Sequence, residues 1–512
     1  ITSQNRHVLA APMSLAVTTE EGTVHSRNAV AAGAWDEEQS DVRVAGTRQQ
    51  DLGKIAVSSS SYIEFDGMMW LDLTVAPKGG EVAVDELTFS IPLNKEYAHL
   101  INAYDYSLRR TGALPSEGFA SSMGPKWVGD EEGGLQVFAE TSENWIVDDK
   151  TKELEIVNGE DAVTFKLHFI NRPAVLKEPH TFSFGFIVTP VKQTIPDMRD
   201  TLSISGRWIP MMEGEGVVGS YYRKAHAAHE NLKVFHIWAQ GWWKTAPGYT
   251  GRPDASGFYP IPRDSLDADY GEAATTYGMK VYHAPYCRLQ QTWAGSPEFE
   301  QFGYEWMSNL NAVFVPNKSV PRAKWRVQVN QASKSFQDFT LHGLNQLMET
   351  TKVKALYFDV SKPHASNNIY AGSGIRIDGG RPLPTTNFLG TRQMLRRIYT
   401  LLREKHPDGR IFFHMSGQVI MPCWSFCDAL VDGENYHSLL DRKNNRGYEN
   451  VLRLDQFAAE YAGQNNFGPY GVKLPQFGRS GAIRGDEWEE IGYQPAEYLL
   501  GLIFLHNSQI WF

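Results

Sequence analysis

Three carboxylates stand where two apolar segments of the sequence end. Asp359 closes the segment 354–359 (KALYFD), and Asp432 and Glu434 lie at the end of 428–434 (DALVDGE) with one glycine between them. A charge beside a buried strand costs free energy unless it is paired or used in chemistry. Two carboxylates can cleave a glycosidic bond, because one protonates the departing oxygen while the other attacks C1 or activates water. We therefore expect these three residues to be catalytic.

The spacing of Asp432, Gly433 and Glu434 suggests separate roles. In an extended segment, residues two apart point to the same side, so both carboxylates could face one cleft. Gly433 leaves room for a substrate to approach. Two neighbouring carboxylates raise the pKa of one of them, which is what a general acid requires. We expect Asp359 to act as nucleophile or base and Glu434 as acid, with Asp432 orienting the substrate or tuning Glu434.

Polar and aromatic side chains also follow the other apolar segments, where they could contact a sugar. The chain holds 14 Trp, 22 Tyr and 26 Phe, and flat rings pack well against pyranose faces. His414 could donate a hydrogen bond to a sugar hydroxyl or to Asp359. We predict substrate contacts from Trp238, Trp242, Trp243, Tyr282, His283, Asn330, Tyr357, His364, Asn367, Asn368, His414, Ser416, Asn435 and Gln476.

Other chemistries lack their sequence signatures. His414 and Ser416 are two apart, but no G-x-S-x-G turn surrounds the serine, so a serine hydrolase is not expected. No tight metal motif surrounds His283, His364 or His414, and we expect neither a metal nor another cofactor.

Eight strands alternating with helical segments would bring these residues together. The helical segments are 336–351, 388–405 (ending in Arg403 and Lys405) and 495–505, with Pro495 at the start. Such a pattern predicts a (β/α)8 barrel of the TIM type, whose active site lies at the carboxyl ends of the strands. The predicted strands are 233–238, 279–284, 325–329, 354–359, 411–415, 428–432, 471–475 and 508–512.

Residues 1–205 read instead as short antiparallel strands, which predicts a β-sandwich. The clearest strands are 68–76, 85–91, 134–139, 153–157 and 162–169, and Asn158-Gly159 suggests a type I′ hairpin. The chain is thus predicted to be a multidomain β plus α/β protein: a β-sandwich domain (1–205), a linker (206–232) and the barrel (233–512). Because the chain ends inside the eighth strand, either a C-terminal segment is absent from this sequence or the barrel closes with less than a full unit.

Composition limits the partners. A net charge of −10 argues against nucleic acid, and no apolar run reaches the roughly 18 residues that span a bilayer. Three cysteines form neither a disulfide framework nor a zinc pattern, so we expect buried thiols. The chain begins at Ile1 without Met, which suggests a removed export signal and a secreted or periplasmic protein. We expect a carbohydrate substrate.

Several motifs resemble bacterial proteins related to glycoside hydrolase family 123. They are 357–368 (YFDVSKPHASNN), 414–417 (HMSG), 432–436 (DGENY) and, in the N-terminal part, 65–68 (FDGM) and 134–145, which ends in ENW. The resemblance implies a β-sandwich followed by a (β/α)8 barrel. It also implies a β-N-acetylgalactosaminidase in which an adjacent Asp-Glu pair acts: the Asp orients the substrate's acetamido group, and the Glu is the acid/base. Asp432 and Glu434 are the nearest match, although Gly433 separates them.

The carboxylates on the fourth and sixth strands also resemble those of α-galactosidase-like retaining barrels. That resemblance implies that Asp359 is the nucleophile, and we prefer it slightly because Asp359 ends its strand. The predicted function is a glycoside hydrolase that removes a terminal sugar during polysaccharide degradation. The alternatives are a substrate-assisted β-N-acetylhexosaminidase using Asp432 and Glu434, and a non-catalytic carbohydrate-binding protein.

Overall fold

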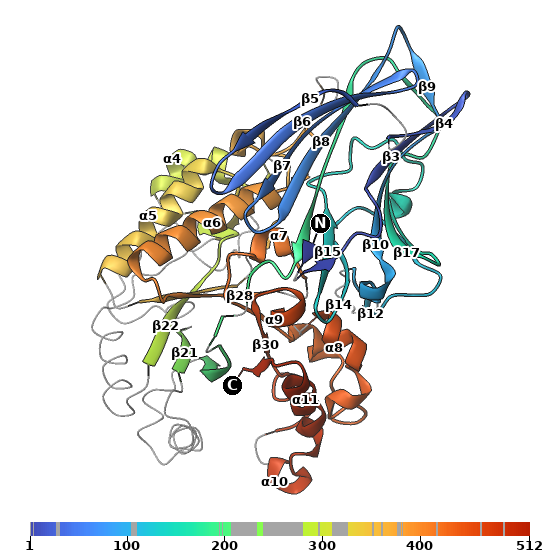
Figure 1. Cartoon of the computed structure of the whole chain (residues 1–512). Helices are drawn as coiled ribbons and strands as arrows, with labels where there is room; N and C mark the ends of the chain where they lie inside the picture. Colours follow the sequence, from blue (N-terminus) through green and yellow to red (C-terminus); the bar gives the residue numbers. More distant parts are fainter. Residues whose placement is uncertain are drawn as a thin grey trace. The chain divides into compact units, whose positions relative to one another are not determined.

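The chain divides into two compact units, shown with their elements in Figure 1. Unit 1 comprises Ile1–Gln193, Val419–Ser425 and Leu454–Gly468, and unit 2 comprises Thr194–Gln418, Phe426–Arg453 and Pro469–Phe512. The computed structural model describes residues 2–3, 5–26, 31–103, 110–193, 195–196, 198–205, 233–238, 280–294, 297–309, 326–350, 353–359, 362–375, 380, 382–415, 418–460, 463–484 and 487–511.

Unit 1 is built around two large antiparallel sheets. The six-stranded sheet has the order β13 (Phe119–Ser121), β16 (Leu154–Asn158), β17 (Ala162–Ile170), β10 (Glu86–Asn94), β3 (Ser14–Thr19) and β4 (Gly22–His25). The nine-stranded sheet has the order β12 (Thr111–Ala113), β11 (Leu100–Asn102), β14 (Lys126–Asp130), β15 (Gly133–Phe138), β19 (His180–Thr189), β8 (Met68–Pro77), β7 (Ile55–Glu64), β6 (Arg43–Leu52) and β5 (Ala31–Gln39).

Alternating apolar residues of both sheets form one core, as the sandwich prediction requires. For example, the rings of Phe89 in β10 and Phe184 in β19 lie 4.9 Å apart between their centroids. All five predicted strands are present, four of them within one residue of their expected ends, whereas β10 continues three residues beyond the predicted end at 91. The hairpin at Asn158-Gly159 is also present, but the type I′ turn is wrong, because the connection is the three-residue Gly159–Asp161 and neither Asn158 nor Gly159 has a positive φ.

Unit 2 contains an eight-stranded sheet in chain order, and every pairing within it is parallel. Its strands are β20 (Thr201–Ser205), β21 (Lys233–Trp238), β22 (Lys280–Cys287), β25 (Ala355–Phe358), β28 (Arg410–His414), β29 (Ala429–Asp432), β30 (Tyr470–Lys473) and β31 (Gln509–Ile510). In β22, β25, β29 and β30, alternate residues point to a shared apolar core that includes Ala355, Tyr357, Ala429 and Val431.

Two predicted features of this sheet need correction. The segment 325–329 is not a strand of it, because β24 (Arg326–Gln328) pairs antiparallel with β23 (Gln291–Trp293). The first strand is instead β20, so the division between the units lies near residue 193 rather than 205. Periodicity identifies a short strand but does not say which sheet it joins. The predicted linker 206–232 lies outside the described residues.

In the described part of the chain, β31 and β20 are not paired, so the structure shows a parallel sheet and leaves the closed barrel a prediction. One hydrogen bond connects the segments at the two edges of the sheet: Nε2 of Gln509 in β31 donates to the carbonyl of Arg199, just before β20, at 3.3 Å.

The predicted helices are confirmed as α5 (Lys334–Thr350), α6 (Phe388–Lys405) and α11 (Gln494–Leu505). The other α-helices in the described ranges are α4 (Pro297–Trp306), α7 (Met421–Trp424), α8 (Leu454–Glu460), α9 (Gly463–Asn466) and α10 (Glu487–Ile491).

The last turn of α6 is tied to the amino edge of the sheet. Arg403 donates to the carboxylate of Asp428 at 2.7 Å, and the same carboxylate accepts the amide N–H of Ile411 at 2.7 Å. Asp428 is 1% exposed, so the charge is buried but paired. This acidic residue therefore joins the starts of β28 and β29 to α6.

The three cysteines are buried and form no disulfide, as predicted. None of the helices that the structure describes combines the length and the apolar composition needed to span a bilayer.

Burial of Lys126 in β14 gives a first prediction, on stability. Burial lowers the pKa of this lysine from 10.5 to about 8, and the nearby Arg110 adds to the shift. Below pH 8 the folded state bears the full cost of the buried ammonium ion, and this cost disappears as the pH rises from 8 to 10.5. We expect Lys126→Met to stabilise unit 1 by about 3 kcal/mol at pH 7 and by little at pH 10.5.

Urea unfolding at both pH values measures this difference. Lys152→Met is the control, because the Lys152 side chain is 68% exposed. A stability gain that is the same at both pH values would contradict the prediction.

Candidate active site

Asp359 lies at the carboxyl edge of the parallel sheet, directly after β25. Its amide N–H donates to the carbonyl of Cys287 at 2.9 Å, which extends the pairing of β25 with β22. One carboxylate oxygen lies 3.9 Å from Nη2 of Arg288, and the other lies 3.7 Å from Nδ1 of His414. The Asp359 side chain is 17% exposed. Asp359 is thus held by a cation after β22 and a histidine at the end of β28 while part of it still reaches solvent.

Tyr357 connects this position with the carboxylates after β29. The side chain is buried in the sheet's core, with its ring centroid 5.6 Å from that of Trp511. Burial raises the pKa of Tyr357 well above 10, and the charges of Glu434 and Asp432 raise it further, whereas Arg288 lowers it. The hydroxyl of Tyr357 is therefore within electrostatic range of Asp432, Glu434 and Arg288.

The turn after β29 differs from its predicted form. The strand ends at Asp432, and Glu434 begins a 3-10 helix (Glu434–Ser438), so the two carboxylates are not neighbours along an extended strand. Gly433 has φ = 138°, and a Cβ at this position would lie 2.2 Å from the carbonyl oxygen of Leu474. The glycine is required by this close approach of the β30 end, and the space that was expected for a substrate is filled by backbone.

Asp432 is enclosed by protein. The residue is 0% exposed, and its Oδ1 accepts the amide N–H of Gly433 at 2.7 Å. In the β29–β30 register it is paired with Lys473, which is also 0% exposed and whose Nζ lies 3.8 Å from the ring centroid of Tyr436.

Glu434 lies at the solvent-exposed side of the sheet's carboxyl edge. Its side chain is 39% exposed and pairs with Arg479, whose own side chain is 57% exposed. Next to it, Asn435 is buried. Gln476 is 1% exposed and donates through Nε2 to the carbonyl of Leu474 at 3.2 Å, but its Oε1 is buried with no hydrogen-bond partner among the described residues. This oxygen is an acceptor that a ligand hydroxyl could satisfy.

The loop after Asp359 is fixed by a buried network of amides and hydroxyls. Asn330 is 0% exposed and donates through Nδ2 to the hydroxyls of Ser366 at 3.0 Å and Ser373 at 2.6 Å. Asn368 donates to the carbonyls of Tyr304 at 2.9 Å and Met307 at 2.6 Å. Both amide groups use their hydrogens inside the protein. These contacts give the two asparagines a positioning role, and the predicted contact with substrate gains no support from them.

Asn367 and His364 lie on the same loop. Asn367 is half-buried, and its amide N–H lies 3.5 Å from Oδ1 of Asn309. The carbonyl of His364 accepts a hydrogen bond from Nδ2 of Asn387 at 3.2 Å. Both ring nitrogens of His364 are buried without a partner in the part of the chain that the structure describes, and burial lowers its pKa to about 4.

Tyr282 is not at this edge. It lies near the start of β22, 2% exposed in the core, with the guanidinium of Arg410 5.8 Å from its ring centroid. Its position does not support the predicted sugar contact.

The remaining predicted contacts cannot be placed. Trp242, Trp243 and Ser416 lie outside the described residues, as do the side chains of Trp238 and His283, although their backbones belong to β21 and β22. Within the described ranges, no three His, Cys, Asp or Glu side chains gather as a metal site requires.

The structure adds Arg288 to the site, which the sequence prediction had not assigned. Burial lowers the pKa of Arg288 to about 10, and its Nη1 donates to Oε1 of Gln291 at 3.1 Å. The available signal was its place directly after β22. A buried arginine at the carboxyl edge of a strand is suited to hold an anionic group.

Comparison with known proteins identifies the class. Residues 1–145 match the family model described as glycoside hydrolase 123, third domain. The predicted relationship to this family is confirmed for that segment, and the protein is a glycoside hydrolase by class. No curated protein matches the chain.

Several solved α-galactosidases show weak structural similarity. The GH36 α-galactosidase AgaB from Geobacillus stearothermophilus has 10% identity and a TM-score of 0.46, over 95% of this chain and 75% of that chain. The α-galactosidase from Lactobacillus brevis has 9% identity and a TM-score of 0.41, over 96% and 73%. TtGalA, an α-galactosidase from Thermus thermophilus, has 11% identity and a TM-score of 0.31, over 78% and 80%. At these values the similarities carry no argument about function.

The turn at Gly433 gives a second prediction. Gly433→Ala places a methyl group against the Leu474 carbonyl at a strained φ, so we expect a loss of about 2–4 kcal/mol in the free energy of unfolding. Urea unfolding measures it. Gly478→Ala is the control, because a Cβ there meets nothing within 4 Å. Equal stability of the two variants would show that the turn relaxes without cost.

His364 gives a third prediction. Its folded pKa of about 4 lies below the ordinary value of 6.5, so the unfolded chain binds the proton first, and stability falls as the pH drops from 6.5 to 4. We expect His364→Phe to remove up to about 3 kcal/mol of this decline. Unfolding at pH 7 and pH 4.5 measures it, with the exposed His342→Phe as control. An unchanged acid profile in His364→Phe would contradict the prediction.

Proposed function

We propose that the chain hydrolyses a terminal glycosidic bond of an oligosaccharide or polysaccharide, with Asp359 and Glu434 as the reacting carboxylates. The observation that carries the proposal is the parallel register of the sheet, in which Asp359 directly follows β25, with Arg288 3.9 Å away, and Glu434 follows the end of β29. Carboxylates from two strands thus share one edge of the sheet, as a reaction that needs two flanking carboxyl groups requires.

The roles of Asp359 and Glu434 follow from their different surroundings. Glu434 delivers a proton to the glycosidic oxygen, and the C1–O bond breaks as positive charge develops on the sugar ring. Asp359 attacks C1 or takes a proton from the attacking water. The Arg288 cation favours the ionised form of the attacking carboxylate. The exposed Arg479–Glu434 pair is worth only about 0–1 kcal/mol, so it can open when a substrate arrives.

The burial of Asp432 favours this scheme over the substrate-assisted one. A residue that orients an acetamido group must touch the substrate, whereas Asp432 is 0% exposed and paired in register with the buried Lys473. In the proposed reaction, Asp432 and Lys473 support the turn that carries Glu434. The partly exposed Asp359 is the better candidate for contact with C1.

Activity of single variants is the fourth prediction. The purified chain is screened on a panel of aryl glycosides and native oligosaccharides, with Asp359→Asn and Glu434→Gln on the best substrate. We expect both to lower kcat by roughly 10²–10⁴-fold. Asp338→Asn and Glu349→Gln are matched controls, because Asp338 pairs with Arg397 and Glu349 pairs with Lys405 on the protein surface.

Two other outcomes would favour the alternative functions. Full activity in Asp359→Asn together with inactive Asp432→Asn would favour the substrate-assisted scheme. Binding of an oligosaccharide without turnover by the wild-type chain would favour a carbohydrate-binding protein. The anomeric form of the first product, followed by ¹H NMR, separates attack on C1 by Asp359 (retention) from activation of water (inversion).

A further inference from the structure

The inner face of the nine-stranded sheet in unit 1 changes from apolar to polar along β6 and β7. Near the β6–β7 turn, Leu52 and Ile55 are fully buried. Farther along the same face the paired residues are Gln50 with Val57, then Arg48 with Ser59. A β-sandwich normally fills this space with large apolar side chains. The serines are too small to fill it, and the arginine brings a charge.

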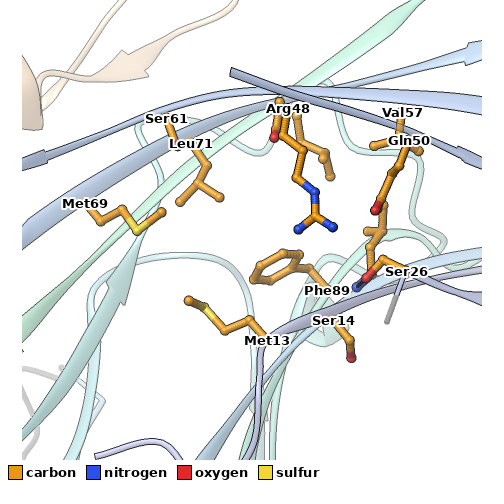
Figure 2. A pocket seen from close by; sticks show the side chains of 13 residues that line it. Met13, Ser14, Ser26, Arg48, Gln50, Val57, Ser61, Met69, Leu71 and Phe89 are labelled. Carbon is orange, nitrogen blue, oxygen red and sulfur yellow. Dashed lines mark hydrogen bonds between the residues drawn. The ribbon is translucent and has the colours of Figure 1, made fainter. Parts of the chain in front are cut away.

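A cavity lies at this place between the two sheets of unit 1. It has a volume of about 160 Å³, with Phe89 of β10 and Leu71 of β8 among its apolar walls and Arg48, Gln50, Ser59 and Ser61 among its polar ones. Figure 2 shows the guanidinium of Arg48 projecting into the space toward the ring of Phe89. An engineered cavity of roughly 150 Å³ takes one benzene-sized molecule, so a sugar ring with its substituents would fill this space and extend toward the exposed Arg48.

Two polar groups that line the cavity can meet a ligand of complementary chemistry: Arg48, which is exposed to solvent, and the buried Oε1 of Gln50. Arg48 makes no hydrogen bond or ion pair with any side chain that the structure describes, whereas Arg43 on the same strand lies 3.7 Å over the ring of Tyr62. Oε1 of Gln50 is buried and has no hydrogen-bond donor within the described ranges. An unsatisfied buried acceptor costs about 1–3 kcal/mol, which a ligand hydroxyl would recover.

We propose that this cavity binds one sugar residue that carries a carboxylate, such as the uronic acid unit of an acidic polysaccharide. The carboxylate pairs with the guanidinium of Arg48, which presents two parallel N–H donors to such a group. A ring hydroxyl donates to Gln50, and the hydroxyls of Ser59 and Ser61 serve the remaining oxygens. The apolar face of the ring packs on Phe89 and Leu71. The site lies within unit 1 and does not depend on the carboxylates of unit 2.

Calorimetric titration of the whole chain with methyl glucuronide and methyl galacturonide tests the proposal. We expect binding to weaken at least 10-fold in Arg48→Gln and in Ser61→Leu, which fills the cavity. Arg43→Gln is the matched control and keeps wild-type affinity, because Arg43 does not line the cavity. Thermal unfolding of each variant verifies folding, and Ser61→Leu should not lower the melting temperature.

The ligand panel separates the sources of affinity. Binding of the neutral methyl glucoside as tightly as of the uronides would overturn the role of charge. Binding of acetate equal to that of the uronides would show that the sugar ring is not recognised. Tighter binding of a sulfated monosaccharide would replace the carboxylate by sulfate and overturn the assignment. Uronide affinity unchanged in Arg48→Gln, or absent in the wild type, would overturn the site.

Discussion

The parallel register of the eight-stranded sheet is the constraint on which the candidate site depends. Because every pairing from β20 to β31 is parallel, all carboxyl ends meet at one edge. The groups that follow β22, β25, β28 and β29 are then brought together whatever their separation in sequence. Arg288, Asp359, His414 and Glu434 lie on this edge for that reason. At the opposite edge the same sheet holds Asp428, whose carboxylate is used entirely for structure.

A backbone contact then separates the roles of the carboxylates. The carbonyl of Leu474 approaches Gly433 so closely that only glycine fits, and the chain leaves β29 in a 3-10 turn instead of continuing extended. Asp432 stays inside beside Lys473, while Glu434 reaches the rim beside Arg479. A residue with a side chain at position 433 would require another path for the chain. The glycine of the sequence Asp432-Gly433-Glu434 is therefore required by the turn. The turn then decides which of the two acids is buried and which is exposed.

Much of the site's framework could be predicted from the sequence, but few of its contacts, the proximity of His414 to Asp359 being one of them. Apolar runs that end in an acid located β25 and β29, and the amphipathic pattern gave α6 with both ends correct. The membership of β24 in a separate hairpin was not predictable, because three residues of strand pattern do not reveal a pairing partner. The burial of Tyr282 and the internal hydrogen bonds of Asn330 were equally hidden. Polar residues on loops look the same in sequence whether they face a ligand or hold the loop together.

Two of the candidate carboxylates are accompanied by a cation from a neighbouring segment: Arg288 for Asp359 and Arg479 for Glu434. Three acids that share one edge would repel each other strongly without these partners. Tyr357 lies among them as a neutral hydroxyl, because its pKa is raised well above 10. A phenol with such a raised pKa keeps its proton near pH 7 and can donate a hydrogen bond. The buried phenol therefore keeps a neutral group between the charged residues of this edge, and the carboxylate of Asp359, whose side chain is 17% exposed, still reaches solvent.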